Sequence, residues 1–508
     1  MRPLFVFLLV LSLSAAILAD ARKIVILQTT DIHSHLSNKN AEEASGWIRL
    51  ASIIKKERAQ GNTLLIDCGD TLQGALVGSV SKGHAAAEML NLLKYDVWIP
   101  GNHDFDFGIK ILEKRCSEIK ADKLAANIKW ENAKIKTLPW KIYHLNEMRI
   151  AVIGLGYPEM DNYYWQGGRH EFKVEDAEKT IDLLMPEVLA STPDMIILAL
   201  HNGYQPVRKQ KEPLISRIAK RHPEINLILG GHIHQEEPGR LIGHSVWYAS
   251  AGYHAQKLLK AEAEIEKEKH KVISIKSILI PLTHSTPEDP EYAEKMSGWL
   301  KKTSEFARLP TGETLEKISP PGEGAFNSTM NELACRAMAK TANAEIAFSG
   351  AGAGTEFRNR IFEGNLFNAF PYEDTICTLE LSQDELKSII YEQLANRKQH
   401  FFQAPWGFHS EITEGKIGNI CMADGKSWTD ENKRIKTAFS SYALASAGGK
   451  FPILKKMALK QECLPYDTGI LERNAVRNYI KSNSPLNIKE EKWLKDARRK
   501  PQHRKTSD

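Results

Sequence analysis

The sequence has few cysteines and almost no long apolar runs. Its 508 residues include six cysteines, too few for a framework of disulfides, so we expect any disulfide to be a local staple. No pair has the Cys-x-x-Cys spacing, which argues against a cysteine metal site. Beyond residue 21 no segment is long and apolar enough to span a membrane, and the C-terminus lacks the apolar tail of a lipid-anchored protein. We therefore expect no membrane anchor in the mature chain.

The chain also lacks a strong charge of one sign. Its net charge is +5, and part of the basic excess lies in the run 495–505, which is typical of a solvated tail. A nucleic acid polymer is therefore not an expected partner. The length exceeds what one ordinary core accommodates, so we predict at least two domains.

The first 21 residues have the pattern of a secretory signal peptide. Arg2 precedes an almost unbroken apolar run over 4–18, and Ala19-Asp20-Ala21 offers a small-x-small cleavage site. A retained membrane anchor is the alternative, but the run is short for a spanning helix. We predict that the mature chain begins near Arg22 and is periplasmic or secreted.

Short apolar runs that end abruptly in polar residues recur in the first half of the chain. Continuous apolar runs of this kind indicate strands buried on both faces, and amphipathic stretches separate them as in a layered α/β domain. The ends of such strands meet at one edge of the sheet, where these domains bind ligands. The runs are 23–28, 63–66, 95–99, 195–200 and 225–229.

A second α/β pattern follows a change of character near residue 285. A single amphipathic stretch over 292–306 predicts a connecting helix, and strand and helix patterns resume from about 318. The predicted division is a signal peptide, a metal domain, a linker helix, a substrate domain and a polar tail, at 1–21, 22–285, 286–317, 318–482 and 483–508.

Polar metal donors stand where the predicted strands of the first domain end. Any one of them could belong to a hydrogen-bonded turn, but their joint occurrence at strand ends favours metal chemistry. The set holds carboxylate, amide and imidazole groups, which suits two divalent ions sharing one carboxylate, and Asp70 is the natural bridge. Such ions, about 3.5–4 Å apart, lower the pKa of a shared water and clamp a phosphoryl group. The donors are Asp31, His33, Asp70, Asn102, His201, His232 and His234.

These motifs resemble those of a known family. Asp31-x-His33, Gly69-Asp70, Gly101-Asn102-His103-Asp104, His201 and Gly231-His232-x-His234 are similar to the signature of the calcineurin-like metallophosphoesterases. The wider layout resembles the 5′-nucleotidase family, which includes UDP-sugar hydrolases, 2′,3′-cyclic-nucleotide phosphodiesterases and ecto-5′-nucleotidases. The resemblance implies an α/β fold with a four-layer α-β-β-α metallophosphoesterase domain, a connecting helix and a second, smaller α/β domain.

The resemblance also assigns roles in the first domain. It implies that two divalent ions, zinc or manganese, are bound, one by Asp31, His33, Asp70 and His234, the other by Asp70, Asn102, His201 and His232. It implies that His103 is a catalytic group beside the phosphoryl group and not a ligand, and that Asp104 orients it. Four further residues have no role in that pattern, and we expect them to support the site or its loops: His35, Asp67, His84 and Asp106.

In the second domain the resemblance is looser. It implies a substrate site of Arg358, Tyr372 and Lys450, although Tyr372 could equally be a strand-edge tyrosine. Lys450 stands where an acid for the ribose is expected, and Leu444 lies near the place of an aromatic residue for the base. A lysine cannot accept hydrogen bonds from a ribose diol. An anionic group is therefore an expected ligand here, whereas nucleoside recognition is open.

The predicted function is that of an extracytoplasmic dinuclear-metal phosphohydrolase, similar to 5′-nucleotidases, which acts on nucleotides or other small phosphate esters through metal-bound hydroxide. A 2′,3′-cyclic-nucleotide phosphodiesterase or a UDP-sugar hydrolase is an alternative within this class. A metal-binding surface protein without catalysis is an alternative from another class, but such a scaffold would have no use for His103. The oligomeric state is left open.

Overall fold

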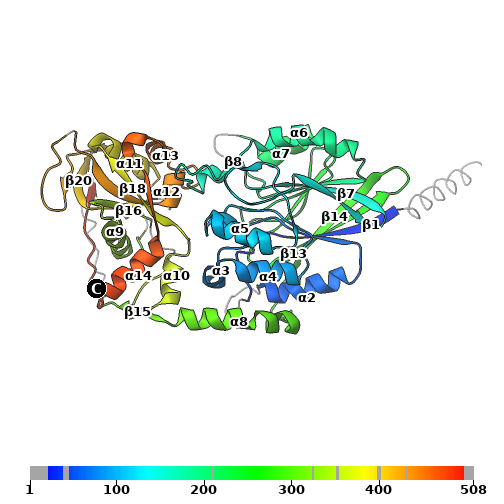
Figure 1. The fold of residues 1–508 in the computed structure, drawn as a ribbon, viewed down its shortest axis with the longest axis horizontal. Coiled ribbons are helices and arrows are strands. Elements are labelled where there is room, and N and C mark those ends of the chain that lie inside the picture. The colour runs from blue at the N-terminus through cyan, green and yellow to red at the C-terminus, as the bar shows by residue number, and fades with distance from the viewer. Residues whose placement is uncertain are drawn as a thin grey trace, which may run out of the picture. The chain divides into compact units, whose positions relative to one another are not determined.

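The computed structural model describes residues 21–37, 45–206, 211–322, 325–350, 354–396, 402–430 and 432–496. The predicted signal peptide up to residue 20, and the end of the predicted tail, lie outside these residues. The chain forms two compact units (Figure 1). The first runs to Met160 and continues over Arg169–Thr303, and the second comprises Asp161–Gly168 and the chain from Ser304 onward.

Two six-stranded sheets form the first unit. One sheet has the order β14-β13-β1-β2-β3-β4, and the other has the order β11-β12-β10-β9-β7-β6. In the first sheet the strands are, in that order, Lys271–Pro281, Lys257–Glu266, Ala21–Thr29, Thr63–Asp67, Val97–Trp98 and Asp122–Lys123. In the second they are Glu236–Ile242, Val246–Ala251, Leu227–Leu229, Met195–Leu200, Met148–Leu155 and Trp140–Leu145. A separate small sheet pairs β5 (Ile128–Trp130) with β8 (Phe172–Val174).

The two large sheets pack face to face, because their strands are apolar on both sides. Ile24 and Ile26 of β1 lie in one core with Ile197 of β9 and Leu227 of β10. Val25, the intervening residue, is also buried, as expected for a strand covered on both faces. The second sheet buries its other face under α6 and α7, which place Ile181 and Ile215 in a shared core.

Helices cover the outer faces of both sheets (Figure 1). On the side of β1 they are α2 (Trp47–Arg58), α3 (Leu76–Ser81), α4 (His84–Leu92) and α5 (Ile109–Glu118), and on the other side they are α6 (Ala177–Ala190) and α7 (Leu214–Arg221). The unit is thus an α-β-β-α sandwich, and the predicted α/β class is confirmed. Helix α8 (Pro290–Ala307) covers the stretch predicted as a connecting helix.

The second unit is built on a five-stranded mixed sheet of order β19-β16-β23-β18-β24. Its strands are, in that order, Ala404–Trp406, Ile346–Ser349, Ile435–Ser440, Thr375–Leu381 and Tyr466–Leu471. The helices are α9 (Thr329–Ala342), α10 (Glu363–Ala369), α11 (Gln383–Asn396), α12 (Ser441–Ala445), α13 (Pro452–Ala458) and α14 (Glu472–Asn483). Phe348 of β16 packs in a core with α11 and α13, and its neighbour Ala347 packs in a core with α9 and α14.

Short strands complete the second unit. They are β15 (Pro310–Glu313), paired with β17 (Arg360–Phe362), and β20 (Phe408–Thr413), which pairs with β21 (Lys416–Ile417), β22 (Cys421–Met422) and β25 (Leu494–Asp496).

The chain beyond residue 482 differs from the predicted polar tail. Strand β25 pairs with β20 in parallel, and Trp493 is buried with its indole N–H donating to Glu332 Oε2 over 2.8 Å. Glu332 also accepts hydrogen bonds from Trp406 and Asn327. The apolar residues in this mostly polar stretch are too few to give a clear pattern, yet they complete the core of the unit.

A short excursion of the chain, Asp161–Gly168, belongs to the second unit, although the residues before and after it in the sequence belong to the first unit. Within Asp161–Gly168, the carbonyl of Asn162 accepts the Gly448 N–H over 2.9 Å. The Lys455 ammonium donates to Asn162 Oδ1 over 3.1 Å, and the ring of Tyr163 lies 5.8 Å from that of Tyr442.

All six cysteines are free thiols, and five of them are buried. None of the helices in the described part of the chain has the length and apolar character needed to cross a membrane.

Candidate metal centre

The predicted donors follow the carboxyl ends of five strands in the first unit. Asp31 and His33 come after β1, Asp70 after β2, Asn102 after β3, His201 after β9, and His232 and His234 after β10. Several of these residues have left-handed backbone angles. A residue other than glycine adopts this conformation at an energetic cost, and residues that do so cluster at functional sites. Those with such positive φ values are Asp31, His33, Asp70, His232 and His234.

One donor group consists of Asp31, His33 and His234. The Nε2 atoms of the two imidazoles lie 3.0 Å apart, and Nε2 of His234 lies 3.5 Å from Asp31 Oδ1. The other ring nitrogen of His33, Nδ1, donates to the carbonyl of Gln73 over 2.9 Å. This bond fixes the tautomer and leaves the lone pair of Nε2 directed at the group, as in metal-ligating histidines.

A second donor group consists of Asp70, His201 and His232. Nδ1 of His201 donates to the carbonyl of Cys68 over 2.6 Å, so in the neutral ring Nε2 carries the lone pair. That Nε2 lies 3.2 Å from Asp70 Oδ2. The ring of Tyr157 stacks on that of His232, with 3.9 Å between the ring centroids, and holds its plane.

Asp70 faces both donor groups. Its Oδ2 atom lies 3.2 Å from His201 Nε2 and 3.9 Å from His33 Nε2, and its Oδ1 accepts the backbone N–H of His103 over 2.7 Å. Gly101 allows this approach, because a Cβ atom there would lie 2.2 Å from Asp70 Oδ1. One carboxylate can therefore serve two cations, as in dinuclear sites.

Asn102 offers an independent test of whether this site suits cations. Its Oδ1 atom is buried and has no hydrogen-bond partner in the described part of the chain. Buried polar atoms are almost always hydrogen-bonded, and an orphaned carbonyl oxygen calls for an explanation. Amide oxygens are common ligands of divalent cations. The residues present thus fit a metal centre.

The electrostatics of most of the site agree with this interpretation. His201 differs, because burial would lower the pKa of its imidazole but Asp70 outweighs burial and raises that pKa to about 9. Burial would raise the pKa of the Asp70 carboxyl, but His201 and His103 outweigh it and hold that pKa well below its usual range. Burial lowers the pKa of His33, and it lowers that of His232 to about 3. Both imidazoles are therefore neutral at physiological pH, which is the form that binds metal ions.

The partner of His103 differs from the prediction. Its Nδ1–H donates to Oδ2 of Asp106 over 2.8 Å, whereas Asp104 was expected to orient it. His103 begins a 3₁₀ helix, His103–Phe105, and in this helix residues three apart lie on one side while adjacent residues diverge. The i, i+3 spacing of a histidine and an aspartate would have indicated Asp106 if a 3₁₀ helix had been expected here.

Asp104 instead organises the loops around the site. Its Oδ2 accepts the N–H groups of Gly101 and Asp70 over 2.7 and 3.0 Å. Its Oδ1 accepts those of Leu72 and Thr71 over 2.8 and 2.9 Å. Four backbone bonds to one buried carboxylate tie the loop after β2 to the loop after β3, and so fix Asp70 beside Asn102.

Other residues around the donors were not predicted to take part. The ring of Tyr253 stacks on that of His234 at 5.0 Å, and the next residue, His254, stacks on His35 at 3.8 Å. Tyr253 and His254 come one residue after the end of β12, whose short mixed sequence did not indicate a buried strand. The same signal of polar groups after a strand would have found them.

The predicted substrate residues all lie in the second unit. Arg358 is exposed and pairs with Glu356 over 2.8 Å, while Tyr372 is 54% exposed. Lys450 is half-buried, and burial lowers the pKa of its ammonium. Leu444 is fully buried in the core, so it offers no surface to a base.

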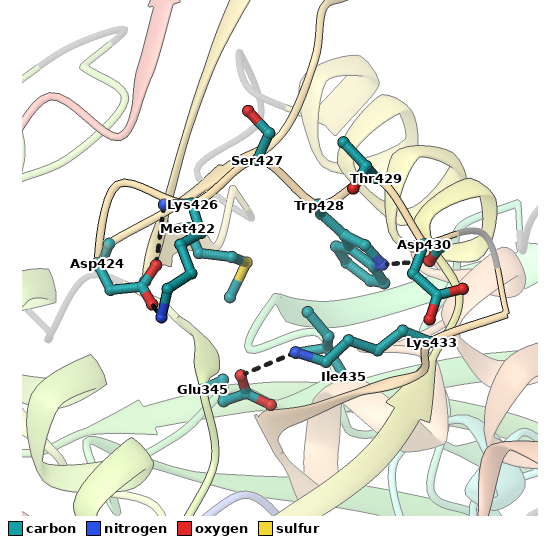
Figure 2. Close-up of a pocket in the computed structure, with 12 residues that line it drawn as sticks. Glu345, Met422, Asp424, Lys426, Ser427, Trp428, Thr429, Asp430, Lys433 and Ile435 are labelled. Carbon is teal, nitrogen blue, oxygen red and sulfur yellow. Dashed lines mark hydrogen bonds and ion pairs between the residues drawn. The ribbon is translucent and has the colours of Figure 1, made fainter.

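A cavity of about 500 Å³ opens in the second unit beside β22. Figure 2 shows the ion pair of Glu345 and Lys433, 3.7 Å long, and the indole of Trp428, whose N–H donates to the Asp430 carbonyl. None of the three predicted substrate residues lines this cavity.

Comparisons with known proteins agree with the geometry. The model of the calcineurin-like phosphoesterase family matches residues 24–236, and that of the 5′-nucleotidase C-terminal domain matches residues 315–456. Human 5′-nucleotidase is 28% identical over 363 residues, which are 63% of this chain and 60% of that protein. The chain thus spans about three fifths of the human relative. A 5′-nucleotidase-related protein of Glossina morsitans morsitans is 23% identical and is covered to 94% of its length by 93% of this chain.

The fold also agrees with a solved structure. The structure of a 5′-nucleotidase precursor from Thermus thermophilus superimposes with a TM-score of 0.69 at 18% sequence identity, over 94% of this chain and 100% of that one. The two matched family segments together span more than half of the sequence, in the order and with the fold that the structure shows. The chain therefore belongs to the 5′-nucleotidase family of calcineurin-like phosphoesterases.

Proposed function

We propose that this protein is an extracytoplasmic hydrolase of phosphate esters, that it uses two divalent ions, and that its substrates are nucleotides or other small phosphorylated metabolites. The observation that carries the proposal is the position of Asp70, whose Oδ2 atom faces the imidazoles of both donor groups. A lone structural metal would not need a shared carboxylate between two complete sets of donors. The pattern of the first 21 residues supports export.

The proposed ligands divide between two ions. Asp31, His33 and His234 would hold one ion, His201, His232 and Asn102 would hold the other, and Asp70 would contact both. When bound, such ions supply a water that is deprotonated near neutral pH and neutralise charge on the phosphoryl oxygens. The hydrogen bonds from His33 to Gln73 and from His201 to Cys68 keep both ligand rings in place.

His103 is the proposed proton donor to the leaving oxygen. Burial would lower the pKa of its imidazole, but Asp106 and Asp70 outweigh it and raise that pKa to about 10. In the protein without bound ions the ring is therefore protonated at neutral pH, and its bond to Asp106 does not depend on the ions. Asp106 accepts the Nδ1–H of His103. The centroid of the His103 ring lies 5.3 Å from that of His33, so the protonated ring is next to a proposed metal ligand.

The substrate beyond the phosphoryl group is proposed from the names of the relatives and from residues of the second unit. Relatives named as 5′-nucleotidases and as a 2′,3′-cyclic-nucleotide 2′-phosphodiesterase/3′-nucleotidase favour a nucleotide. Arg358, Tyr372 and Lys450 are the proposed contacts to it. The burial of Leu444 disfavours a sandwich of the base at that position, so esters without a nucleoside belong in the test.

The test is a substrate screen on protein loaded with Mn²⁺ or Zn²⁺ and shown to hold two ions per chain. The panel contains 5′-nucleotides, 2′,3′-cyclic nucleotides, UDP-sugars, sugar phosphates and a generic diester, with released phosphate, base and sugar all measured. We expect turnover of at least one phosphate ester. A loaded protein that turns over no member is a binding protein and not a hydrolase.

His103→Ala is the matched variant for this screen. We expect it to keep both ions and to slow turnover by roughly 10²–10⁴, the range for a lost acid or base. An unchanged rate would remove His103 from the reaction.

A further inference from the structure

Two histidines outside the proposed ligand set form a stacked pair beside the metal donors. The rings of His35 and His254 lie with centroids 3.8 Å apart and planes inclined by 25°. His35 follows the loop of Asp31 and His33, whereas His254 follows β12, more than two hundred residues later. The fold therefore brings them together at the same sheet edge as the metal donors.

The pair lies against one of the two donor groups. The ring centroid of His254 is 5.7 Å from that of His33 and 5.7 Å from that of His234. These distances exceed those within the donor groups, and neither His35 nor His254 belongs to a set of possible metal ligands in the described residues. The pair is thus a neighbour of the metal centre and not part of its ligand shell.

The backbone at His254 is held in a costly conformation. Its φ angle is +52°, in the left-handed region where glycine is favoured. Its N–H donates to the carbonyl of Asp31 over 2.8 Å, so the turn is tied to a proposed ligand. A bulky residue in such a place is typical of positions where the side chain serves a function.

The ring nitrogens of the pair are available to a ligand. Both rings are half-buried, and among the residues that the structure describes none forms a hydrogen bond with a ring nitrogen of either histidine. These nitrogens are also absent from the fully buried polar atoms without a partner, so they reach solvent. A neutral imidazole offers one N–H donor and one acceptor.

We propose that the His35–His254 pair is a binding subsite for an oxygen atom of the phosphoryl group, on the side of the centre formed by Asp31, His33 and His234. The subsite rests on the function proposed above. An N–H group there would donate to a non-bridging oxygen while the ions neutralise its charge. Phosphate dianions, with more terminal oxygens, would gain more from it than diesters.

The test measures inorganic phosphate binding by calorimetry to protein holding two ions per chain. His254→Gly suits the left-handed backbone and removes one ring, and His35→Phe keeps the stack but removes the ring nitrogens. We expect each variant to keep both ions and to bind phosphate about tenfold more weakly, which is the effect of one hydrogen bond to a charged group. KM for a monoester should rise similarly while kcat changes less.

Two further variants sharpen the result. His84→Phe is the control, because the contacts of His84 are to Glu118 and Trp299, neither of which is a proposed ligand, and this variant should bind phosphate as the unchanged protein does. His254→Asn tolerates the left-handed backbone and keeps a donor, so it should recover part of the affinity.

Several outcomes would overturn the subsite. They are unchanged phosphate affinity in both His254→Gly and His35→Phe, loss of an ion in both, or no phosphate binding by the unchanged protein. If the unchanged protein binds phosphate and both variants weaken it, but no ester is turned over, the subsite stands and the proposed hydrolase function fails.

Discussion

Nδ1 of His103 lies 2.8 Å from Oδ2 of Asp106, three residues further along the chain, and the carboxylate of the adjacent Asp104 points instead at four backbone amides. Two neighbouring aspartates thus serve different purposes. One holds a catalytic candidate, and the other holds the loops that carry the metal donors.

Asp106→Asn should slow catalysis without disturbing the metal centre. The amide cannot balance the charge of a protonated imidazole, so we expect kcat to fall at least about tenfold, toward the roughly 10²–10⁴ of a lost acid or base, with KM and metal content nearly unchanged. Steady-state kinetics with elemental analysis measures this. A loss of ions in this variant would contradict the assignment of Asp106 to His103.

Asp104→Ala should act on stability. The change leaves four buried N–H groups without an acceptor, and leaving even one or two of these unpaired costs about 1–3 kcal/mol each. We expect a lower denaturation midpoint in urea, together with weaker metal binding because the loops carrying Asp70 and Asn102 loosen. A midpoint equal to that of Asp106→Asn would show that the two aspartates do not differ in this way.

Removing Asp70, the proposed shared ligand, should reduce the number of bound ions more than removing Asn102, a proposed ligand of one ion. We expect Asp70→Ala to lose high affinity for both ions, because its carboxylate faces both groups, and Asn102→Ala to lose affinity for only one. Elemental analysis after dialysis against a weak chelator gives the ratio of ions per chain. Equal ratios in the two variants would argue against a shared Asp70.

Asp67 should make the metal-free protein less stable as the pH rises. Burial raises the pKa of its carboxyl to about 7, while an unfolded aspartate ionises near pH 4. Between these values the folded state binds the extra proton, so the free energy of unfolding falls as pH rises from about 4 to about 7. Asp67→Asn, which imitates the neutral carboxyl, should show a smaller fall. Urea titrations at several pH values measure the difference.

The strand-end donors could be predicted because each apolar run of the first unit ends where its parallel strand leaves the sheet. β1, β2, β9 and β10 all deliver their donors to one edge by this rule. This rule alone placed Asp31 and His201, which are far apart in the sequence, in one set of metal donors.

Other features were not predicted, for local reasons. The partner of His103 depends on a single 3₁₀ turn, which sequence patterns do not distinguish from a loop. His254 follows a strand, β12, in which serine and tyrosine interrupt the apolar pattern. Trp493 stands among charged residues, and only its bond to Glu332, more than 150 positions earlier, makes its segment part of the core.

The assignment of Asp161–Gly168 to the second unit has a practical consequence for dissecting the molecule. Neither unit is a continuous stretch of chain, so a gene fragment that begins after α8 lacks residues against which Gly448 and Lys455 are packed. After a protease cut in α8, residues 161–168 remain in the N-terminal fragment, so only non-covalent packing against them would hold the C-terminal fragment. Recombinant fragments should therefore carry this excursion as a grafted loop, or the full chain should be used.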